Sequence, residues 1–126
     1  VLPFNTNQYW LCPMLDARRM EVYTQLFSVN GQPQSEVHAL VVDQSSFKDT
    51  LDHQGILFFG NGTGKCKETI QHPNAFFLPD VQPAAGKLGE LAFQKFLQAD
   101  FEDAAIFEPF YLKEFIAKKP KSGQLC

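Results

Sequence analysis

The stretch that decides the fold is Met14-Leu15-Asp16-Ala17-Arg18-Arg19-Met20-Glu21-Val22-Tyr23. A nearly continuous apolar run over residues 9–15 enters it, and a run over residues 21–29 that is rich in strand-forming residues leaves it. The residues between the two runs are mixed in charge and reverse the chain. This pattern predicts a β-hairpin.

The tip of this hairpin has a high density of charge. Asp16, Arg18, Arg19 and Glu21 place two acids and two bases within six residues, whereas tight turns are usually built from Gly, Asn or Pro. The four groups either pair across the hairpin, where each exposed pair contributes about 0–1 kcal/mol, or recognise a partner. Because a guanidinium binds a carboxylate in a fixed fork, we expect Asp16 to face one of the two arginines.

The whole chain has the size and composition of one domain. Its 126 residues fall within the usual range for a single domain. Thirteen phenylalanines predict a core packed largely with aromatic rings. The net charge of −3 argues against the chain being the main nucleic-acid-binding surface, because phosphate contacts need clustered Lys and Arg.

Outward from the hairpin, the pattern predicts a mixed α/β fold. A third strand over residues 36–42 completes an antiparallel meander, and Pro13 is expected at an edge or a bulge, because it cannot donate to a ladder. After Asp43 the spacing of the apolar residues changes. A capping box from Ser46 to Asp49 is expected to start a short helix. Residues 56–59 and 75–78 are expected to form buried strands on either side of another short helix. Strands that alternate with helices are connected by parallel crossovers.

In the last third of the chain, the spacing of apolar residues predicts the longest helix, over residues 83–97. Pro83 suits its first turn, and Ala85, Gly89 and Ala92 form a small-residue ridge that we expect to approach the sheet closely. Residues 107–112 form a last short strand or extended segment. Residues 114–126 are expected to be a flexible tail.

A glycine-rich turn follows the strand over residues 56–59. Gly60, Asn61 and Gly62 open a helix, the place where backbone N–H groups favour an anion. The spacing fits neither common phosphate-binding motif. G-x-x-x-x-G-K-[ST] would need a glycine in place of Phe59, and G-x-G-x-x-G would need a glycine in place of Lys65. The turn is therefore either a tight strand-to-helix connection or a weak nucleotide contact.

No residue set in the sequence matches a catalytic or metal motif. His38, His53 and His72 lack the H-x-x-x-H spacing of a metal pair, and no G-x-S-x-G surrounds a serine. Cys12 and Cys66 lie in or beside apolar runs, where thiols are usually inert. Three widely spaced cysteines predict a reducing, cytoplasmic compartment, and no run is long enough to span a membrane.

Two motifs resemble those of a known family. Residues 15–23, LDARRMEVY, resemble the LDARRGEVY motif in the second half of the bacterial TsaB (YeaZ) proteins, with Met20 in place of Gly. Residues 108–113, EPFYLK, resemble the family's closing P-x-Y-L-R, which maps onto Pro109 and Tyr111, with Lys113 where Arg is common. The family motif residues carried over are Asp16, Arg18, Arg19, Glu21, Tyr23, Pro109 and Tyr111.

The resemblance implies a role in transfer-RNA modification. TsaB-like proteins are two-lobed members of the ribonuclease-H-like, actin-like superfamily, and this chain resembles the second lobe only. They are the non-catalytic partner of the metal-dependent transferase that makes threonylcarbamoyladenosine at adenosine 37, and were formerly labelled glycoproteases. The implied partners are that catalytic subunit and an ATPase subunit, with tRNA contacted indirectly and ATP bound in the full complex but by no site of this lobe alone.

A second function remains open. The glycine-rich turn would also suit the nucleotide-binding lobe of a sugar-kinase-like enzyme of the same superfamily. A D-x-S phosphate hairpin without H-x-x-x-H in a first lobe would favour the scaffold, and a catalytic Asp with sugar-contacting residues would favour the kinase. If a first lobe is missing, we expect an exposed apolar patch over residues 9–11.

Overall fold

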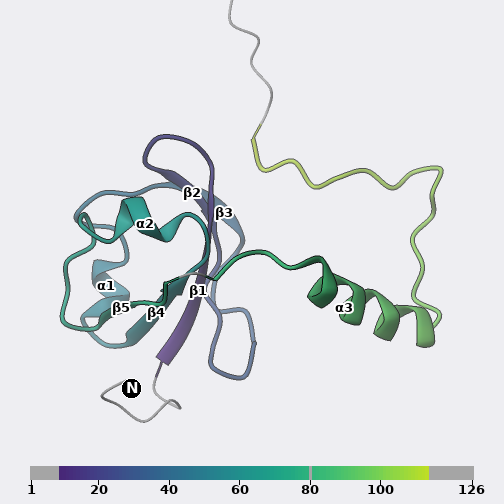
Figure 1. The fold of residues 1–126 in the computed structure, drawn as a ribbon, viewed down its shortest axis with the longest axis horizontal. Coiled ribbons are helices and arrows are strands. Elements are labelled where there is room, and N and C mark those ends of the chain that lie inside the picture. The colour runs from purple at the N-terminus through teal and green to yellow at the C-terminus, as the bar shows by residue number, and fades with distance from the viewer. Residues whose placement is uncertain (1–8, 80, 114–126) are drawn as a thin grey trace, which may run out of the picture.

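The computed structural model of the chain describes residues 9–79 and 81–113, and the tail predicted over residues 114–126 lies outside them. The described strands form one five-stranded sheet in the order β3-β2-β1-β4-β5. α1 and α2 lie against this sheet, whereas α3 projects away from it (Figure 1). The elements in chain order are β1 (Tyr9–Asp16), β2 (Glu21–Thr24), β3 (His38–Val41), α1 (Lys48–Leu51), β4 (Gly55–Phe59), α2 (Thr63–Cys66), β5 (Ala75–Phe77) and α3 (Ala85–Leu97).

β1 is the central strand and joins two differently built halves of the sheet. β2 runs antiparallel to β1, and β3 runs antiparallel to β2. β4 runs parallel to β1, and β5 runs parallel to β4. The prediction of an antiparallel meander followed by parallel strands, in a mixed α/β fold, is confirmed.

Pro13 interrupts the ladder between β1 and β2. Beyond it Leu11 exchanges two backbone hydrogen bonds with Phe27, 2.7 and 2.9 Å long, so the pairing resumes. Because Pro13 has no N–H to donate, β2 ends at Thr24, whose hydroxyl donates to Pro13 O at 2.9 Å. The expectation that this proline lies at an edge or a bulge is wrong, and the strand predicted over residues 21–29 is shorter for the same reason.

One face of the sheet forms the hydrophobic core with α1 and α2. Phe58 lies at the centre of this core, stacked on Phe77 with ring centroids 5.0 Å apart and in edge contact with Phe47 at 5.2 Å. Only Tyr9 and Phe58 are aromatic among the described buried hydrophobic residues, whereas five phenylalanines between Phe93 and Phe110 are exposed. The prediction of a core packed largely with aromatic rings is therefore wrong, because these five rings lie on or after α3, which leaves the sheet. The largest fully buried side chains are Phe58, Met14, Leu51, Ile56, Val22, Cys12 and Cys66.

α1 begins without the predicted capping box. Its N-cap is Phe47, which has a φ of 62° and provides no side-chain cap. Ser46 Oγ instead accepts the N–H of Asp43 at 2.9 Å, and Asp43 Oδ1 accepts the N–H of Ser45 at 2.8 Å. The prediction is wrong because a local turn uses the same serine hydroxyl, a competition that is common for Ser and Asp.

α3 does not cover the sheet. Its N-cap is Ala84 in extended backbone, so Pro83 precedes the helix instead of lying in its first turn. None of its residues is buried, and a Cβ added at Gly86 or Gly89 would meet nothing within 4 Å. The predicted close approach of the small-residue ridge is wrong, because the extended connection before Ala85 carries the chain away from the sheet.

The start of β1 is covered, contrary to the expectation of an exposed patch over residues 9–11. Tyr9 is only 3% exposed, and Trp10 and Leu11 are half-buried. The Tyr9 ring contacts Phe76 with centroids 5.2 Å apart, and a Cβ on its strand neighbour Gly55 would lie 2.7 Å from that ring. The parallel pairing of β1 with β4 buries this side chain, so the prediction is wrong.

Residues 107–112, predicted as a strand or an extended segment, form no strand. Across residues 9–79 and 81–113, no helix has the length and apolar character needed to cross a bilayer.

Removing the Thr24 hydroxyl should destabilise the fold. In Thr24→Val the carbonyl of half-buried Pro13 loses this donor, and we expect the free energy of unfolding to fall by about 1–2 kcal/mol although valine is the better strand former. Urea denaturation measures this change. Thr50→Val, at a half-buried position of α1, is the control and should shift stability by less than about 0.5 kcal/mol; equal effects would contradict the role of the hydroxyl.

Candidate functional site

The charged hairpin tip and the glycine-rich turn form one site. The N–H of Asp16 donates to Asn61 Oδ1 at 2.9 Å, and the N–H of Gly62 donates to Met14 O at 2.9 Å. They meet because β1 and β4 are neighbouring parallel strands, whose carboxyl ends lie at the same edge of the sheet. Asp16 and Asn61 are 45 positions apart in the sequence, so local pattern alone predicts two separate candidate sites.

Lys65 of α2 is the cation that binds Asp16. Its Nζ contacts Asp16 Oδ1 and also donates to the backbone carbonyl of Glu21 at 2.7 Å. The same carboxylate oxygen accepts the N–H of Arg18 at 3.0 Å. Hydrogen bonds from Lys65 and from the Arg18 backbone hold the pKa of Asp16 below its ordinary value.

The predicted fork between Asp16 and an arginine is therefore wrong. Within residues 9–79 and 81–113, no ion pair joins Asp16 to the side chain of Arg18 or Arg19. Lys65 takes that place, because the turn after β4 brings α2 beside the end of β1. Lys65 was missed as a site residue, since only the pairing of the two strands reveals its proximity to Asp16.

The second family motif reaches the same hairpin. Lys113 Nζ forms an ion pair with Glu21 Oε1, whose side chain is 20% exposed, and this hydrogen bond raises the pKa of Lys113. Pro109 and Tyr111 are exposed, and Tyr23 is half-buried in β2 opposite Leu15. The structure thus joins the two motifs through Glu21 and Lys113.

The hairpin turn is strained at its two arginines. Arg18 and Arg19 have φ values of 74° and 48°, in the left-handed region that costs an L-residue about 1–2 kcal/mol. Both side chains are exposed. Met20, where the family has Gly, does not share the positive φ, and its side chain packs against the core.

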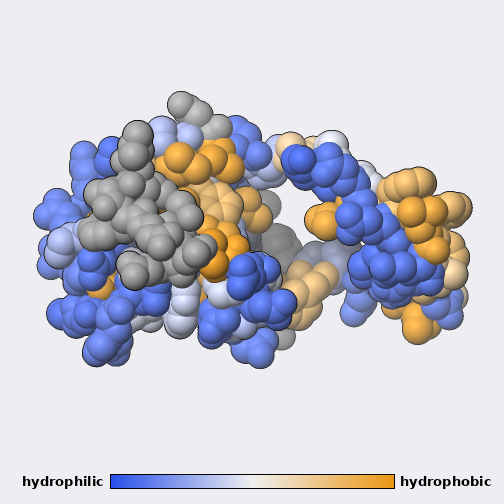
Figure 2. All heavy atoms as spheres, turned by 90° about the horizontal axis from the view of Figure 1, so that it is seen from below, coloured by the Kyte–Doolittle hydropathy of each residue, from blue (hydrophilic) through white to orange (hydrophobic). Residues whose placement is uncertain are grey.

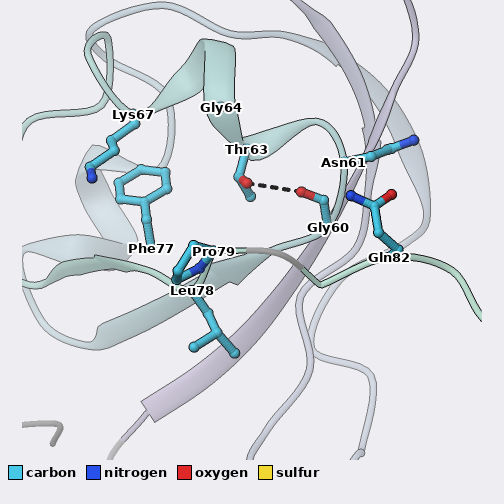
Figure 3. A pocket seen from close by; sticks show the side chains of 9 residues that line it. All are labelled: Gly60, Asn61, Thr63, Gly64, Lys67, Phe77, Leu78, Pro79 and Gln82. Atoms are coloured by element: carbon cyan, nitrogen blue, oxygen red, sulfur yellow. Dashed lines mark hydrogen bonds between the residues drawn. The ribbon is translucent and has the colours of Figure 1, made fainter.

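A pocket of about 330 Å³ opens beside the glycine-rich turn (Figure 3). It lies at the carboxyl ends of β4 and β5, where ligands of open α/β sheets commonly bind. The hydroxyl of Thr63 donates to Gly60 O at 2.8 Å and so holds the turn itself. The lining residues are Gly60, Asn61, Thr63, Gly64, Lys67, Phe77, Leu78, Pro79 and Gln82.

The two described thiols are buried. Burial raises the pKa of Cys12 to about 12, and its Sγ lies 3.0 Å from Thr24 Oγ1. Burial also raises the pKa of Cys66. Both groups are therefore protonated at neutral pH and poorly nucleophilic.

The histidines occupy separate places in the fold. His72 Nε2 lies 3.0 Å from Asp52 Oδ1, while His38 Nδ1 and His53 Nδ1 each lie 3.0 Å from a backbone carbonyl. Over the described part of the chain, no three His, Cys, Asp or Glu side chains converge as metal ligands would.

Comparison with known proteins identifies the fold. No family model and no curated protein matches the sequence. Among solved structures, the crystal structure of an uncharacterized protein with similarity to peptidase YEAZ from Pseudomonas aeruginosa matches with a TM-score of 0.62 and 20% sequence identity. The match covers 82% of this chain and 49% of that protein, so the chain spans about half its length. The chain therefore has the fold of a YeaZ-like structure, in agreement with the two sequence motifs.

Gly60 should tolerate no side chain. Its φ is +110°, and a Cβ would lie 2.4 Å from Met14 O, a backbone atom that cannot move aside. We expect Gly60→Ala to lower the free energy of unfolding by about 3 kcal/mol or more. In the matched control Gly64→Ala, the new Cβ meets nothing within 4 Å in α2, and stability should rise by about 0.5–1 kcal/mol. Chemical denaturation of both variants gives the comparison, and similar losses would contradict it.

The pairing of Asp16 with Lys65 should make stability depend on pH. Because the pKa of Asp16 is lowered in the folded state, its contribution is fully present above the unfolded pKa of about 3.9 and disappears as the pH falls through the folded value. We expect Asp16→Asn to be less stable than the parent at pH 7, with a difference that shrinks below about pH 4.

Urea denaturation between pH 7 and pH 2.5 measures this difference. Glu68→Gln, which neutralises another exposed carboxylate, is the control and should follow the parent across the range. A constant loss in Asp16→Asn at every pH would show that the charge of Asp16 is not what stabilises the turn.

Proposed function

We propose that this chain is a non-catalytic scaffold lobe, of the ribonuclease-H-like, actin-like type, in the machinery that makes threonylcarbamoyladenosine in tRNA. The observation that carries the proposal is the cluster in which Asp16, Lys65, Glu21 and Lys113 bind one another and hold the hairpin tip. Both motifs that resemble the TsaB family contribute to this cluster. The match to a YeaZ-like structure supports the same assignment at the level of the fold.

In this proposal the tip presents its two arginines to a partner. Lys65 already pairs with Asp16, and Lys113 with Glu21, so both carboxylates of the tip are taken by lysines and leave the guanidinium groups of the two arginines to a partner. Backbone strain at exposed residues is typical of functional sites, because folding alone does not favour it. The guanidinium groups would bind carboxylates of the catalytic subunit in bidentate pairs.

The chemistry of the described side chains supports a role without catalysis. A hydrolase or transferase needs an activated nucleophile or a metal-bound water. The thiols of Cys12 and Cys66 have raised pKa values, and the three histidines lie in separate contacts. The catalytic step, the bound ATP and the direct contact with tRNA would then belong to other parts of a cytoplasmic complex.

A second candidate function is a nucleotide-binding lobe of a sugar-kinase-like enzyme. The observation that favours it is the 330 Å³ pocket, which combines a glycine-rich turn with Lys67 and Gln82 at the carboxyl ends of parallel strands. Titration of the chain with an ATP analogue separates the two candidates: micromolar binding that is lost in Lys67→Ala would favour the kinase-like lobe.

Arginine geometry at the tip should matter for assembly more than for folding. Because lysine lacks the planar fork, we expect Arg18→Lys and Arg19→Lys each to change unfolding free energy by less than about 0.5 kcal/mol. Capture by the catalytic subunit should weaken about tenfold, which is about 1.4 kcal/mol, and threonylcarbamoyl transfer in the reconstituted complex should fall with it.

The control is Lys48→Arg, which keeps the charge of an exposed side chain on α1. It should leave both capture and transfer unchanged. A large loss of stability in either arginine variant would show that the tip is structural, and unchanged capture by both would refute its role in assembly.

A further inference from the structure

α3 presents an apolar surface that no described residue of the chain buries. A helix of 13 residues is marginal in water unless a face of it packs, yet every residue of α3 is exposed. Apolar side chains gather on it in the space-filling view (Figure 2). Its five large apolar side chains are between 60% and 68% exposed: Leu88, Leu91, Phe93, Phe96 and Leu97.

The residues after α3 extend this surface, and residues 85–111 together are here named the α3 arm. Phe96 contacts Phe93 and Phe101 with ring centroids 6.4 and 5.8 Å apart, so the rings form one patch. With the exposed side chains beyond it, the arm presents roughly 1,000 Å² of apolar surface, against a few hundred Å² for the largest patch of a typical monomer. The further exposed residues are Phe101, Ile106, Phe107, Phe110 and Tyr111.

The sheet has a matching apolar surface on the side opposite α1 and α2, here named the second sheet face. Strand register places its side chains on one side. Tyr9, at the start of β1, is buried on this face, whereas its other apolar side chains are half-buried or exposed. Parallel strands normally have both faces covered, but no described helix buries a side chain against this face. Its large members include Leu11, Leu15, Tyr23, Val41, Leu57 and Phe59.

The chain holds its own arm away from this face. One end is fixed where the N–H of Leu78 donates to Phe58 O at 2.9 Å, and the other end is fixed by the ion pair of Lys113 with Glu21. Between these anchors the arm projects from the sheet (Figure 1). The arm is therefore exposed without breaking any intrachain packing.

We propose that the α3 arm packs on the second sheet face of a second copy, in a reciprocal two-fold exchange. Each copy carries both halves of the interface, as an isologous dimer requires. Two arms of roughly 1,000 Å² and the faces they cover would remove several thousand Å² from water, within the range of about 2,000–5,000 Å² seen in obligate homodimers. Lys87, Glu90 and Gln94 share the opposite side of α3 and would remain in solvent. The proposal does not depend on the proposed function.

The first test is the mass of the chain in solution at about 50 µM, by light scattering coupled to size exclusion. We expect a dimer, and a monomer for Leu91→Asp/Phe96→Asp. Neither residue belongs to the buried core, so the far-UV circular dichroism spectrum of this variant should still show a folded sheet. The control Gln94→Asp adds a charge on the polar side of α3 and should remain dimeric.

The second test mixes two variants that are each monomeric. Leu15→Lys damages the second sheet face, and Leu91→Asp/Phe96→Asp damages the arm. The mixture should recover a dimer, because one intact arm meets one intact face.

Three results would overturn the exchange. They are a monomeric parent chain, a dimer that survives Leu91→Asp/Phe96→Asp, and a mixture that stays monomeric. A monomeric parent whose α3 amides are protected from hydrogen exchange would show that the arm folds onto its own sheet. A monomeric parent with unprotected α3 amides would leave the other half of a two-lobed protein as the occupant.

Discussion

The parallel pairing of β1 with β4 is the interaction on which the remaining structure depends. It joins an antiparallel meander to a strand–helix–strand unit and places Tyr9 over Gly55, where a side chain would collide with the ring. At the other end of the same pair, Gly60 and Gly62 approach the backbone of Met14 too closely for any Cβ to be accommodated without movement. The core and the candidate site are therefore consequences of one strand pair.

The ion pairs at this end of the sheet act through geometry more than through stability. Exposed pairs contribute little to folding, but Lys65 reaches both the carboxylate of Asp16 and the carbonyl of Glu21, and so fixes the hairpin relative to α2. The positive φ values of Arg18 and Arg19 are maintained within this frame. A recognition tip held in this way would be rigid without using the side chains of Arg18 and Arg19 for its support.

The apolar surfaces are unevenly distributed. One face of the sheet is closed by α1, α2 and the stacked rings around Phe58. Within residues 9–79 and 81–113, no helix covers the second sheet face, and the apolar side chains of α3 are exposed. Burial of apolar area is the main stabilising term in folding and association alike. The apolar side chains of α3 are the ones that the proposed exchange would remove from water.

The sequence by itself determined the order and type of the strands, the place of the turns and the exclusion of common catalytic motifs, because apolar periodicity and the chemistry of Gly and Pro act over short distances. It also identified most of the candidate site, including Asp16, the two arginines, Glu21 and the turn at Gly60. Only the tertiary structure decided that Lys65 binds Asp16, that Ser46 caps a turn in place of a helix, and that α3 leaves the sheet. An apolar stripe shows that an element must be buried, but not against which surface, and an ion pair between distant residues depends on a strand register that local pattern does not contain.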